Sequence, residues 1–557
     1  MRTLIHALLW PRLLLVAVLM TSLYRPALAN EAIVDRIEAL NTGHTVEVLG
    51  APLLARQALS QFYASNGYQL AWTSPEHRRQ MLAALESASH DGLDPADYHA
   101  DLLSGLTSRP DSEMSPELQA DLDLLFSDAF LVFGSHLLEG KVNPQTIHAE
   151  WSANRRQREL DKILTGALAD GSIGQTLEAL RPTHPDYHRL VTARQALVQL
   201  LGQPWLPLAE QPTIRPGDRD DRLPEIRRRL IALGDLTDPQ PAAEPNHYAD
   251  ELATIVPAFQ ARHGLEPDGI IGQQTLAALN RLPLERIRQI DATLERWRWL
   301  PETLGERFVL VNIAGYELKL MDKGQELLRQ RVIVGQPFRQ TPVFSDRIRY
   351  LVVNPTWTVP RKLMIEDQLP QILQSPDYLE RLNMKVYRGW GADRQQVDPA
   401  TVDWPSLSRN NFPYQLVQDP GPTNALGQIK FMFPNQYDVY LHDTPSQGLF
   451  GRAERSFSSG CIRVERPFLL AEKLLAEDRR YTPDRLKTLV DSKRPETIVL
   501  NQPVPVYLQY WTAWVDDNDQ LQFRNDIYNR DSRLLARLRE TPAGDAQRLT
   551  PVSVSSQ

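Results

Sequence analysis

Two short stretches, Asp438-Val439-Tyr440-Leu441-His442 and Ser459-Gly460-Cys461-Ile462-Arg463-Val464, decide how the C-terminal half of this chain is interpreted. In the first, two apolar residues alternate with Tyr440 and His442, which is the side-chain period of a half-buried strand. We therefore expect His442 to project from the open face of a sheet, beside Tyr440. In the second, a polar loop leads through a glycine into Cys461, so the cysteine lies where a loop meets a regular element.

Cys461 and His442 are also the minimum chemistry for a thiolate nucleophile. Cys461 is the only cysteine in the chain, and every other histidine lies at or before His263. A thiol is mostly protonated below its free pKa of ~8.5, and a nearby imidazole can remove its proton. The alternative is a buried structural thiol near an unrelated surface histidine, because free cysteine is often buried. The loop position favours catalysis, since backbone N–H groups around Ser459 and Gly460 can face an oxyanion there.

Residues 1–29 have the pattern of a secretory signal peptide. Arg2 and Arg12 form a basic start, an apolar run extends from Leu13 to Met20, and Ala27-Leu28-Ala29 supplies a cleavage site. We expect this segment to be removed and no membrane span to remain in the mature chain. An exported chain with one cysteine forms no internal disulfide, so a free thiol in an oxidising compartment points to a function for that thiol.

Composition argues against several classes of function. The formal net charge is −8, which disfavours nucleic acid and anionic membranes as the main partners. With one cysteine and no H-E-x-x-H motif, no metal site is expected. A length of 557 residues with 42% hydrophobic residues is typical of an ordinary multidomain protein, at ~100–200 residues per domain.

Helical periodicity in the N-terminal part and short β-branched runs from Arg307 onward predict a multidomain α+β protein. After residues 1–29 we expect a helical scaffold domain (30–205), a small three-helix module (206–285), a β-rich catalytic domain (286–515) and a C-terminal extension and tail (516–557). Residues 362–424 interrupt the strands and are predicted to form an inserted lid or capping subdomain, because long insertions are commonly functional. The alternative is a solvated decoration with its own small core.

The three-helix module contains a string, from Phe259 to Asn280, that resembles a peptidoglycan-binding module. The residues that carry the likeness are Phe259, Gln260, Asp268, Gly269, Gly272 and Thr275. In so small a module the same residues also build turns and core. Binding of peptidoglycan is therefore what the resemblance implies, and spacing alone does not establish it.

The string from His442 to Cys461 and on to Val464 resembles the active-site signature of L,D-transpeptidases with a YkuD-type catalytic domain. It is most similar to the large YcbB-type subgroup of the Gram-negative periplasm, which implies a periplasmic location. Further likenesses lie at 92–98, 295–301, 354–357 and 420–427. Many smaller members have a histidine where this chain has Ser459. The subgroup has serine there, which leaves His442 as the only imidazole available as a base.

The resemblance implies a reaction and a set of roles. Cys461 would attack the carbonyl of the third residue of a stem tetrapeptide, His442 would act as base and then acid, and D-Ala would leave. The amine of a second stem would then open the thioester and form a 3→3 cross-link. The implied residues are Gly460, Cys461 and Ser459 for the oxyanion through their backbone, and Tyr440, Arg463, Trp357 and Asn424 for substrate.

Several alternatives stay open at this point. Tyr440 could serve strand packing and Arg463 a surface salt bridge. Water could replace the acceptor amine, which would make the protein an L,D-carboxypeptidase or a cross-link hydrolase. A non-catalytic wall-binding scaffold with an incidental thiol is the rival from another class. The family implies acylation of Cys461 by carbapenems, donor and acceptor stem peptides as partners, other wall-synthesis enzymes as further candidates, and no cofactor.

Overall fold

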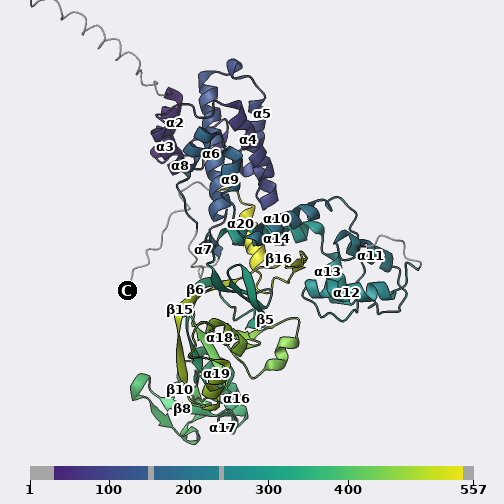
Figure 1. The fold of residues 1–557 in the computed structure, drawn as a ribbon, viewed down its shortest axis with the longest axis vertical. Coiled ribbons are helices and arrows are strands. Elements are labelled where there is room, and N and C mark those ends of the chain that lie inside the picture. Colours follow the sequence, from purple (N-terminus) through teal and green to yellow (C-terminus); the bar gives the residue numbers. More distant parts are fainter. Residues whose placement is uncertain (1–29, 148–155, 238–243, 543–557) are drawn as a thin grey trace, which may run out of the picture.

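The computed structural model describes residues 30–147, 156–237 and 244–542. The predicted signal peptide lies outside these ranges. A helical bundle occupies one end of the molecule, a β-rich domain the other, and a three-helix unit projects to one side (Figure 1). This arrangement confirms the predicted multidomain α+β class. In the part of the chain that is described, no helix is both long and apolar enough to cross a bilayer.

The N-terminal bundle is built around helix α6 (Pro116–Glu139), which is buried on almost every side. Ser115 begins this helix, because its hydroxyl accepts a hydrogen bond from the N–H of Leu118 at 3.2 Å. The helices packed around it are α2 (Glu31–Asn41), α3 (Arg56–Ser65), α4 (Pro75–Glu86), α5 (Ala100–Thr107), α8 (Leu160–Asp170) and α9 (Ile173–Glu178). A helix that is apolar all round is stable only inside such a bundle.

Helix α14 (Pro283–Arg298) connects the parts of the molecule. It packs against α10 (Pro185–Val198), contacts α6 and lies against α20 (Arg530–Leu538). Near its C-terminal end, Arg298 forms an ion pair with Glu295 at 2.7 Å, and both side chains are fully buried. Arg298 also donates to the Asp91 carbonyl of the bundle at 2.9 Å. This helix therefore ties the bundle to the β-rich domain through charges that water does not reach.

The β-rich domain is a nine-stranded sheet that closes on itself. The strand order is β13-β5-β14-β12-β11-β6-β15-β3-β4, and β4 pairs again with β5. The strands are β3 (Arg307–Asn312), β4 (Glu317–Asp322), β5 (Gln325–Gly335), β6 (Phe344–Val353), β11 (Ile429–Met432), β12 (Leu441–His442), β13 (Ser456–Ser458), β14 (Ile462–Val464) and β15 (Glu496–Gln509). Alternate residues of these strands fill the interior, and helices α18 (Pro467–Leu474) and α19 (Pro483–Asp491) add to this core.

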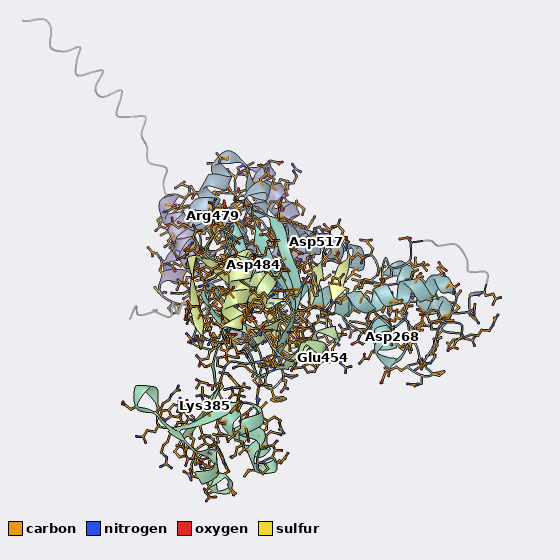
Figure 2. The ribbon with its side chains drawn as sticks, turned by 60° about the horizontal axis from the view of Figure 1, so that its bottom comes forward. Asp268, Lys385, Glu454, Arg479, Asp484 and Asp517 are labelled. Carbon is orange, nitrogen blue, oxygen red and sulfur yellow. The ribbon has the colours of Figure 1, made fainter. Side chains whose placement is uncertain are left out.

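The insertion forms a separate lobe. Its sheet has the order β7-β10-β8-β9, formed by β7 (Trp357–Thr358), β8 (Met384–Arg388), β9 (Gln395–Val397) and β10 (Tyr414–Gln418), with the short helices α16 (Leu369–Gln374) and α17 (Tyr378–Arg381) beside it. The lobe has its own hydrophobic cluster and stands apart from the main body, as the position of Lys385 makes clear (Figure 2). An independent core suits a lid as well as a decoration.

The side unit contains α11 (Leu223–Ala232), α12 (Asp250–Arg262) and α13 (Gln273–Asn280) around one small cluster. It meets the main body at a C-terminal hairpin formed by β16 (Ala513–Val515) and β17 (Leu521–Phe523). Two backbone contacts fix this junction. Arg262 donates to the Leu521 carbonyl at 3.0 Å, and Arg524 donates to the Arg262 carbonyl at 3.0 Å.

Candidate active site

Strand register brings Cys461 and His442 to one face of the sheet. β12 and β14 run parallel, with Leu441 opposite Ile462, and both of these side chains are fully buried in the core. Paired residues of neighbouring strands point to the same side. The opposite face therefore carries Tyr440, His442, Cys461 and Arg463. This juxtaposition agrees with the prediction that Arg463 shares the face of Cys461.

The prediction that His442 lies on an open face is wrong, because its side chain is only 4% exposed. Its Nδ1 lies 2.5 Å from the Asp443 carbonyl oxygen, so in the neutral ring Nδ1 carries the hydrogen, and the backbone of Leu426 makes a second hydrogen bond with the ring. Burial, followed by the positive charge of Arg463, lowers the pKa of His442 to about 3. The resting imidazole is therefore neutral at any physiological pH.

Asp443 holds the backbone that carries His442. Its carboxylate accepts hydrogen bonds from the N–H groups of Gln428 at 2.9 Å and Thr444 at 2.7 Å. Gly427 lies directly against this carboxylate with φ of +62°, and a Cβ there would collide with it. Glycine is therefore required at this close approach.

The Cys461 thiol is partly exposed and has few partners. Sγ lies 3.6 Å from the Asp438 carbonyl oxygen, and the described residues include no hydrogen bond between Sγ and His442. Burial raises the pKa of Cys461 to about 11, although hydrogen bonds from the backbone and side chain of Tyr440 act to lower it. The resting pair is therefore a neutral thiol beside a neutral imidazole.

This resting state predicts how Cys461 reacts with iodoacetamide. Only the thiolate is alkylated, so the rate should rise about tenfold per pH unit between pH 7 and 10, without a plateau. Glutathione measured alongside should begin to level near its free pKa of ~8.5. A plateau for Cys461 below pH 8 would instead indicate a preformed thiolate–imidazolium pair.

Two cations flank the thiol. Lys430 on β11 lies opposite His442, and its ammonium is 5.5 Å from the centroid of the Tyr440 ring. Neither Lys430 nor Arg463 forms an ion pair with a carboxylate of the described chain, and Nε of Arg463 is buried without a hydrogen-bond partner. Burial lowers the pKa of both groups. Half-buried cations without a carboxylate partner suit the carboxylates of a substrate.

Of the backbone groups predicted to face an oxyanion, the N–H of Gly460 is already hydrogen-bonded within its loop. Gly460 has φ of +117°, its N–H already donates to Ser458 Oγ at 3.2 Å, and its carbonyl accepts from Thr341 Oγ1 at 2.8 Å. The Gly460 N–H is therefore not free for an oxyanion. The N–H of Cys461 has no acceptor among the described residues and is the better candidate.

Ser459 is exposed, and its hydroxyl accepts a hydrogen bond from Nη1 of Arg339 at 3.0 Å. Arg339 belongs to the loop after β5, which lies against the segment leading to Cys461. The same loop is fixed from the other side by the hydroxyl of Tyr528, which donates to the Gly335 carbonyl at 2.5 Å, and by Arg530, which donates to the Thr341 carbonyl at 3.1 Å. The segment predicted only as an extension and tail thus supports the candidate site.

Two predicted substrate contacts lie elsewhere. Asn424 is fully buried, and its amide donates to the carbonyls of Pro355 at 3.1 Å and Asp419 at 3.0 Å. It therefore fixes the connection from the lobe back to the sheet and cannot reach a substrate. Trp357 lies in β7 and packs against the core of the lobe.

The predicted residues of the side unit form an internal network. The amide nitrogen of Gln260 donates to Asp268 at 2.9 Å and to the Thr275 hydroxyl at 3.0 Å, and its oxygen accepts from the Gly269 N–H at 2.8 Å. Phe259 is fully buried, and Gly272 is the N-cap residue of α13. These residues fix the fold of the unit, so a ligand would contact others.

Three family models match separate parts of the chain. Residues 306–491 match a model described as "L,D-transpeptidase catalytic domain", residues 219–279 one described as "Putative peptidoglycan binding domain", and residues 57–193 one described as "Scaffold domain". These matches support the predicted catalytic-domain family. They do not single out the YcbB-type subgroup, which stays a prediction.

Similar proteins include one from Haemophilus influenzae named "Putative L,D-transpeptidase", which is 39% identical over 247 residues. The match covers 44% of this chain and 49% of that protein. Among solved structures, an L,D-transpeptidase from Mycobacterium smegmatis is 12% identical with a TM-score of 0.17, covering 37% of this chain and 58% of that one. One from Xylanimonas cellulosilytica is 14% identical with a TM-score of 0.18, covering 54% of this chain and 100% of that one.

Proposed function

The chain carries an L,D-transpeptidase catalytic domain at residues 306–491, and from this premise we propose that it forms 3→3 cross-links between peptidoglycan stem peptides through a thioester on Cys461. The observation that supports this most directly is the shared face of His442 and Cys461, flanked by cations without carboxylate partners. The wall polymer that such an enzyme acts on lies outside the cytoplasmic membrane, which supports the proposed periplasmic location.

In the first half-reaction, Sγ of Cys461 attacks the carbonyl of the third stem residue while its proton passes to Nε2 of His442. The N–H of Cys461 faces the oxyanion that forms, a donor worth ~3–4 kcal/mol where such donors have been removed. Collapse of this intermediate breaks the bond to the terminal residue, and His442 returns the proton to the departing D-Ala amine. A thioester remains on Cys461.

In the second half-reaction, the side-chain amine of another stem attacks the thioester carbon. His442 accepts a proton from this amine and returns it to Sγ as the C–S bond breaks. Arg463 and Lys430 are proposed to hold a carboxylate of the donor peptide, because both are cationic and neither has an acidic partner among the described residues. The reacting atoms balance without a metal or redox cofactor.

Product analysis tests this proposal. Purified disaccharide tetrapeptide should give dimers together with free D-Ala in mass spectra. Tripeptide monomers without dimers would instead indicate hydrolysis of the same thioester. Unchanged substrate, with no adduct after incubation with a carbapenem, would favour a non-catalytic wall-binding scaffold.

The inserted lobe is proposed to act as a lid, and a charge contact supports this role. Arg339 forms a two-point ion pair with Asp367 of the lobe at 2.6 and 2.7 Å, and a further pair with Glu366 at 2.9 Å. The same guanidinium donates to Ser459, two residues before Cys461. The Arg339 side chain thus connects the lobe to the catalytic loop, the segment that leads to Cys461.

Replacing Arg339 by glutamine should release the lobe from this loop. Cross-linking of large muropeptides should fall about tenfold, because charged hydrogen bonds of this kind contribute ~1.5–3 kcal/mol. Acylation by a small carbapenem should change less than about twofold, since a small acylating agent needs little positioning by a lid. Intact mass and dimer yield measure the two effects.

Arg381→Gln is the matched control, because Arg381 lies on the same lobe in an exposed pair with Asp377. This control should leave both rates unchanged. Equal losses of cross-linking and acylation in Arg339→Gln would show that Arg339 supports only the loop and not a lid.

A further inference from the structure

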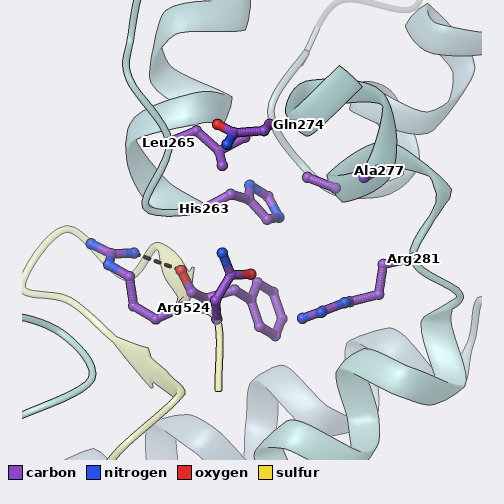
Figure 3. Close-up of a pocket in the computed structure, with 9 residues that line it drawn as sticks. His263, Leu265, Gln274, Ala277, Arg281 and Arg524 are labelled. Carbon is purple, nitrogen blue, oxygen red and sulfur yellow. Dashed lines mark hydrogen bonds between the residues drawn. The ribbon is translucent and has the colours of Figure 1, made fainter. Parts of the chain in front are cut away.

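A cavity of about 160 Å³ lies where the side unit meets the C-terminal hairpin (Figure 3). Its lining residues come from both segments and include His263, Leu265, Gln274, Ala278, Arg281 and Arg524. Arg281 extends into this space from one side, and His263 borders it from the helix above (Figure 3). Residues of the side unit and residues 523–525 at the end of the C-terminal hairpin both line the cavity, so the side unit alone does not contain it.

Arg281 reaches into this cavity, Arg286 lies behind it, and the guanidinium of Arg524 turns away from it toward backbone carbonyls (Figure 3). Arg281 donates to the Gln289 side-chain oxygen at 2.7 Å, and Arg524 donates to the carbonyls of Arg262 at 3.0 Å and Phe523 at 2.7 Å. Arg286, directly behind His263, is fully buried, and its Nε has no partner. In the described chain none of Arg281, Arg286 and Arg524 forms an ion pair, whereas the neighbouring Arg262 is paired with Asp235.

Burial dominates the acid–base properties of Arg286 and Arg524. Burial, reinforced by the charges of Arg262 and Arg281, lowers the pKa of Arg286 to about 9, although Asp235 and Glu285 act to raise it. Burial lowers the pKa of Arg524 to about 10, although Glu317 acts to raise it. Burying cations without a counter-charge is costly, so an anion placed in this cavity would be bound favourably.

The remaining lining narrows the type of anion. Leu265 and Ala278 present small apolar surfaces, and the Gln274 amide can donate a hydrogen bond. The volume of the cavity, about 160 Å³, suits one residue at the end of a peptide rather than a long chain. A carboxylate carrying a small apolar side chain matches both the arginines and the apolar wall, whereas a bare phosphate would use only the charges.

The position of the cavity connects it to the candidate active site. Leu265 lines it, and the carboxylate of the next residue, Glu266, accepts a hydrogen bond from the N–H of Ala453 at 2.8 Å. Ala453 belongs to the loop that joins His442 to Cys461. Glu454, the following residue, lies on the side of the β-rich domain that faces the unit carrying Asp268 (Figure 2).

We propose that this cavity is a second substrate site, which binds the C-terminal carboxylate of a peptidoglycan stem peptide with its alanine methyl against Leu265 and Ala278. The identity of the ligand rests on the proposed function. A peptidoglycan chain whose stem peptide is bound there would lie near the loop between His442 and Cys461. The site would therefore keep the peptidoglycan beside the enzyme during successive reactions.

The test uses full-length protein with Cys461→Ala, which cannot turn over, titrated calorimetrically with N-acetyl-D-alanine, N-acetyl-D-alaninamide and inorganic phosphate. The acid should bind, and the neutral amide should bind at least about tenfold more weakly. Arg281→Gln should weaken binding of the acid by about tenfold or more. Gln274→Glu should do the same, because it places a carboxylate at the rim.

Gln273→Glu makes the same charge change on the same turn of α13, but Gln273 bonds to Glu210 and does not line the cavity. This control should bind the acid within about twofold of the parent. Equal binding of acid and amide, unchanged binding in Arg281→Gln, or phosphate binding as tightly as the acid would overturn the proposed stem-peptide site. All variants must show the cooperative melt of the parent.

Failure of this proposal is separable from failure of the proposed function. A protein whose Cys461 is acylated and forms dimers, but whose cavity does not select the acid, would overturn the second site alone. A protein whose cavity selects the acid while Cys461 stays unreactive would overturn the proposed transpeptidase activity alone.

Discussion

Replacing Cys461 by alanine should abolish cross-link formation from purified tetrapeptide muropeptides. Loss of a covalent nucleophile reduces turnover by a factor on the order of 10⁴–10⁶, because the groups of a catalytic unit act together. His442→Ala should cause a loss of similar order, since no other histidine lies beyond His263 in this chain. Dimer yield by chromatography and mass spectrometry gives the measurement.

Cys461→Ser separates chemistry from packing, because a hydroxyl occupies nearly the same space and is a much weaker nucleophile here. All three variants should melt at the temperature of the parent. Dimer formation in Cys461→Ala above the background without enzyme would exclude the thioester mechanism. If Cys461→Ala lost both its cooperative melt and its activity, the result would not separate misfolding from lost chemistry. The activity of a folded Cys461→Ser protein would then decide between the two.

Replacing Arg298 by methionine should cause the largest loss of stability. The change leaves the Glu295 carboxylate fully buried without its cation, and removes the bond from Arg298 to the Asp91 carbonyl. Breaking one side of a buried ion pair costs about 3–5 kcal/mol. Urea unfolding followed by tryptophan fluorescence should show the loss, because Trp297 and Trp299 adjoin this residue in the buried interior.

Two comparisons sharpen this prediction. The double variant Arg298→Met with Glu295→Gln should be more stable than Arg298→Met alone, since no unpaired charge is then buried. Arg381→Met, which breaks the exposed pair with Asp377, should cost no more than about 1 kcal/mol. Equal, small losses of unfolding free energy in Arg298→Met and Arg381→Met would contradict this prediction. They would mean that water reaches the Glu295 carboxylate once Arg298 is removed.

The sequence indicated which residues share the candidate site better than it indicated what surrounds them. A single cysteine and an alternating segment singled out Cys461 and His442, and the register of β12 and β14 places both on one face with Arg463. Burial of His442 could not be predicted, because period-two alternation gives the side of a strand but not what covers that side. Lys430 was missed for a related reason: its role depends on the register of β11 against β12.

Other differences come from contacts between distant segments. Arg339 and Thr341 contact the segment leading to Cys461, and Tyr528 contacts the loop after β5. These residues lie far apart in the sequence, so no local pattern marks them. Asn424 was assigned to substrate because it lies in a family-like string, but such a string does not reveal which way a side chain points. Its buried amide instead holds backbone carbonyls.

The buried links of α14 also bear on how the protein is made. A ribosome delivers Asp91 well before Arg298, which bonds to its carbonyl from a position 207 residues later. The hydrogen bond from the Lys141 ammonium to the Leu538 carbonyl forms later still, because Leu538 is translated 397 residues after Lys141. Tyr528 and Arg530, which fix the loop beneath Cys461, also come late in translation. A nascent or prematurely terminated chain would therefore contain Cys461 and His442 without the contacts that Tyr528 and Arg530 make with the loop after β5.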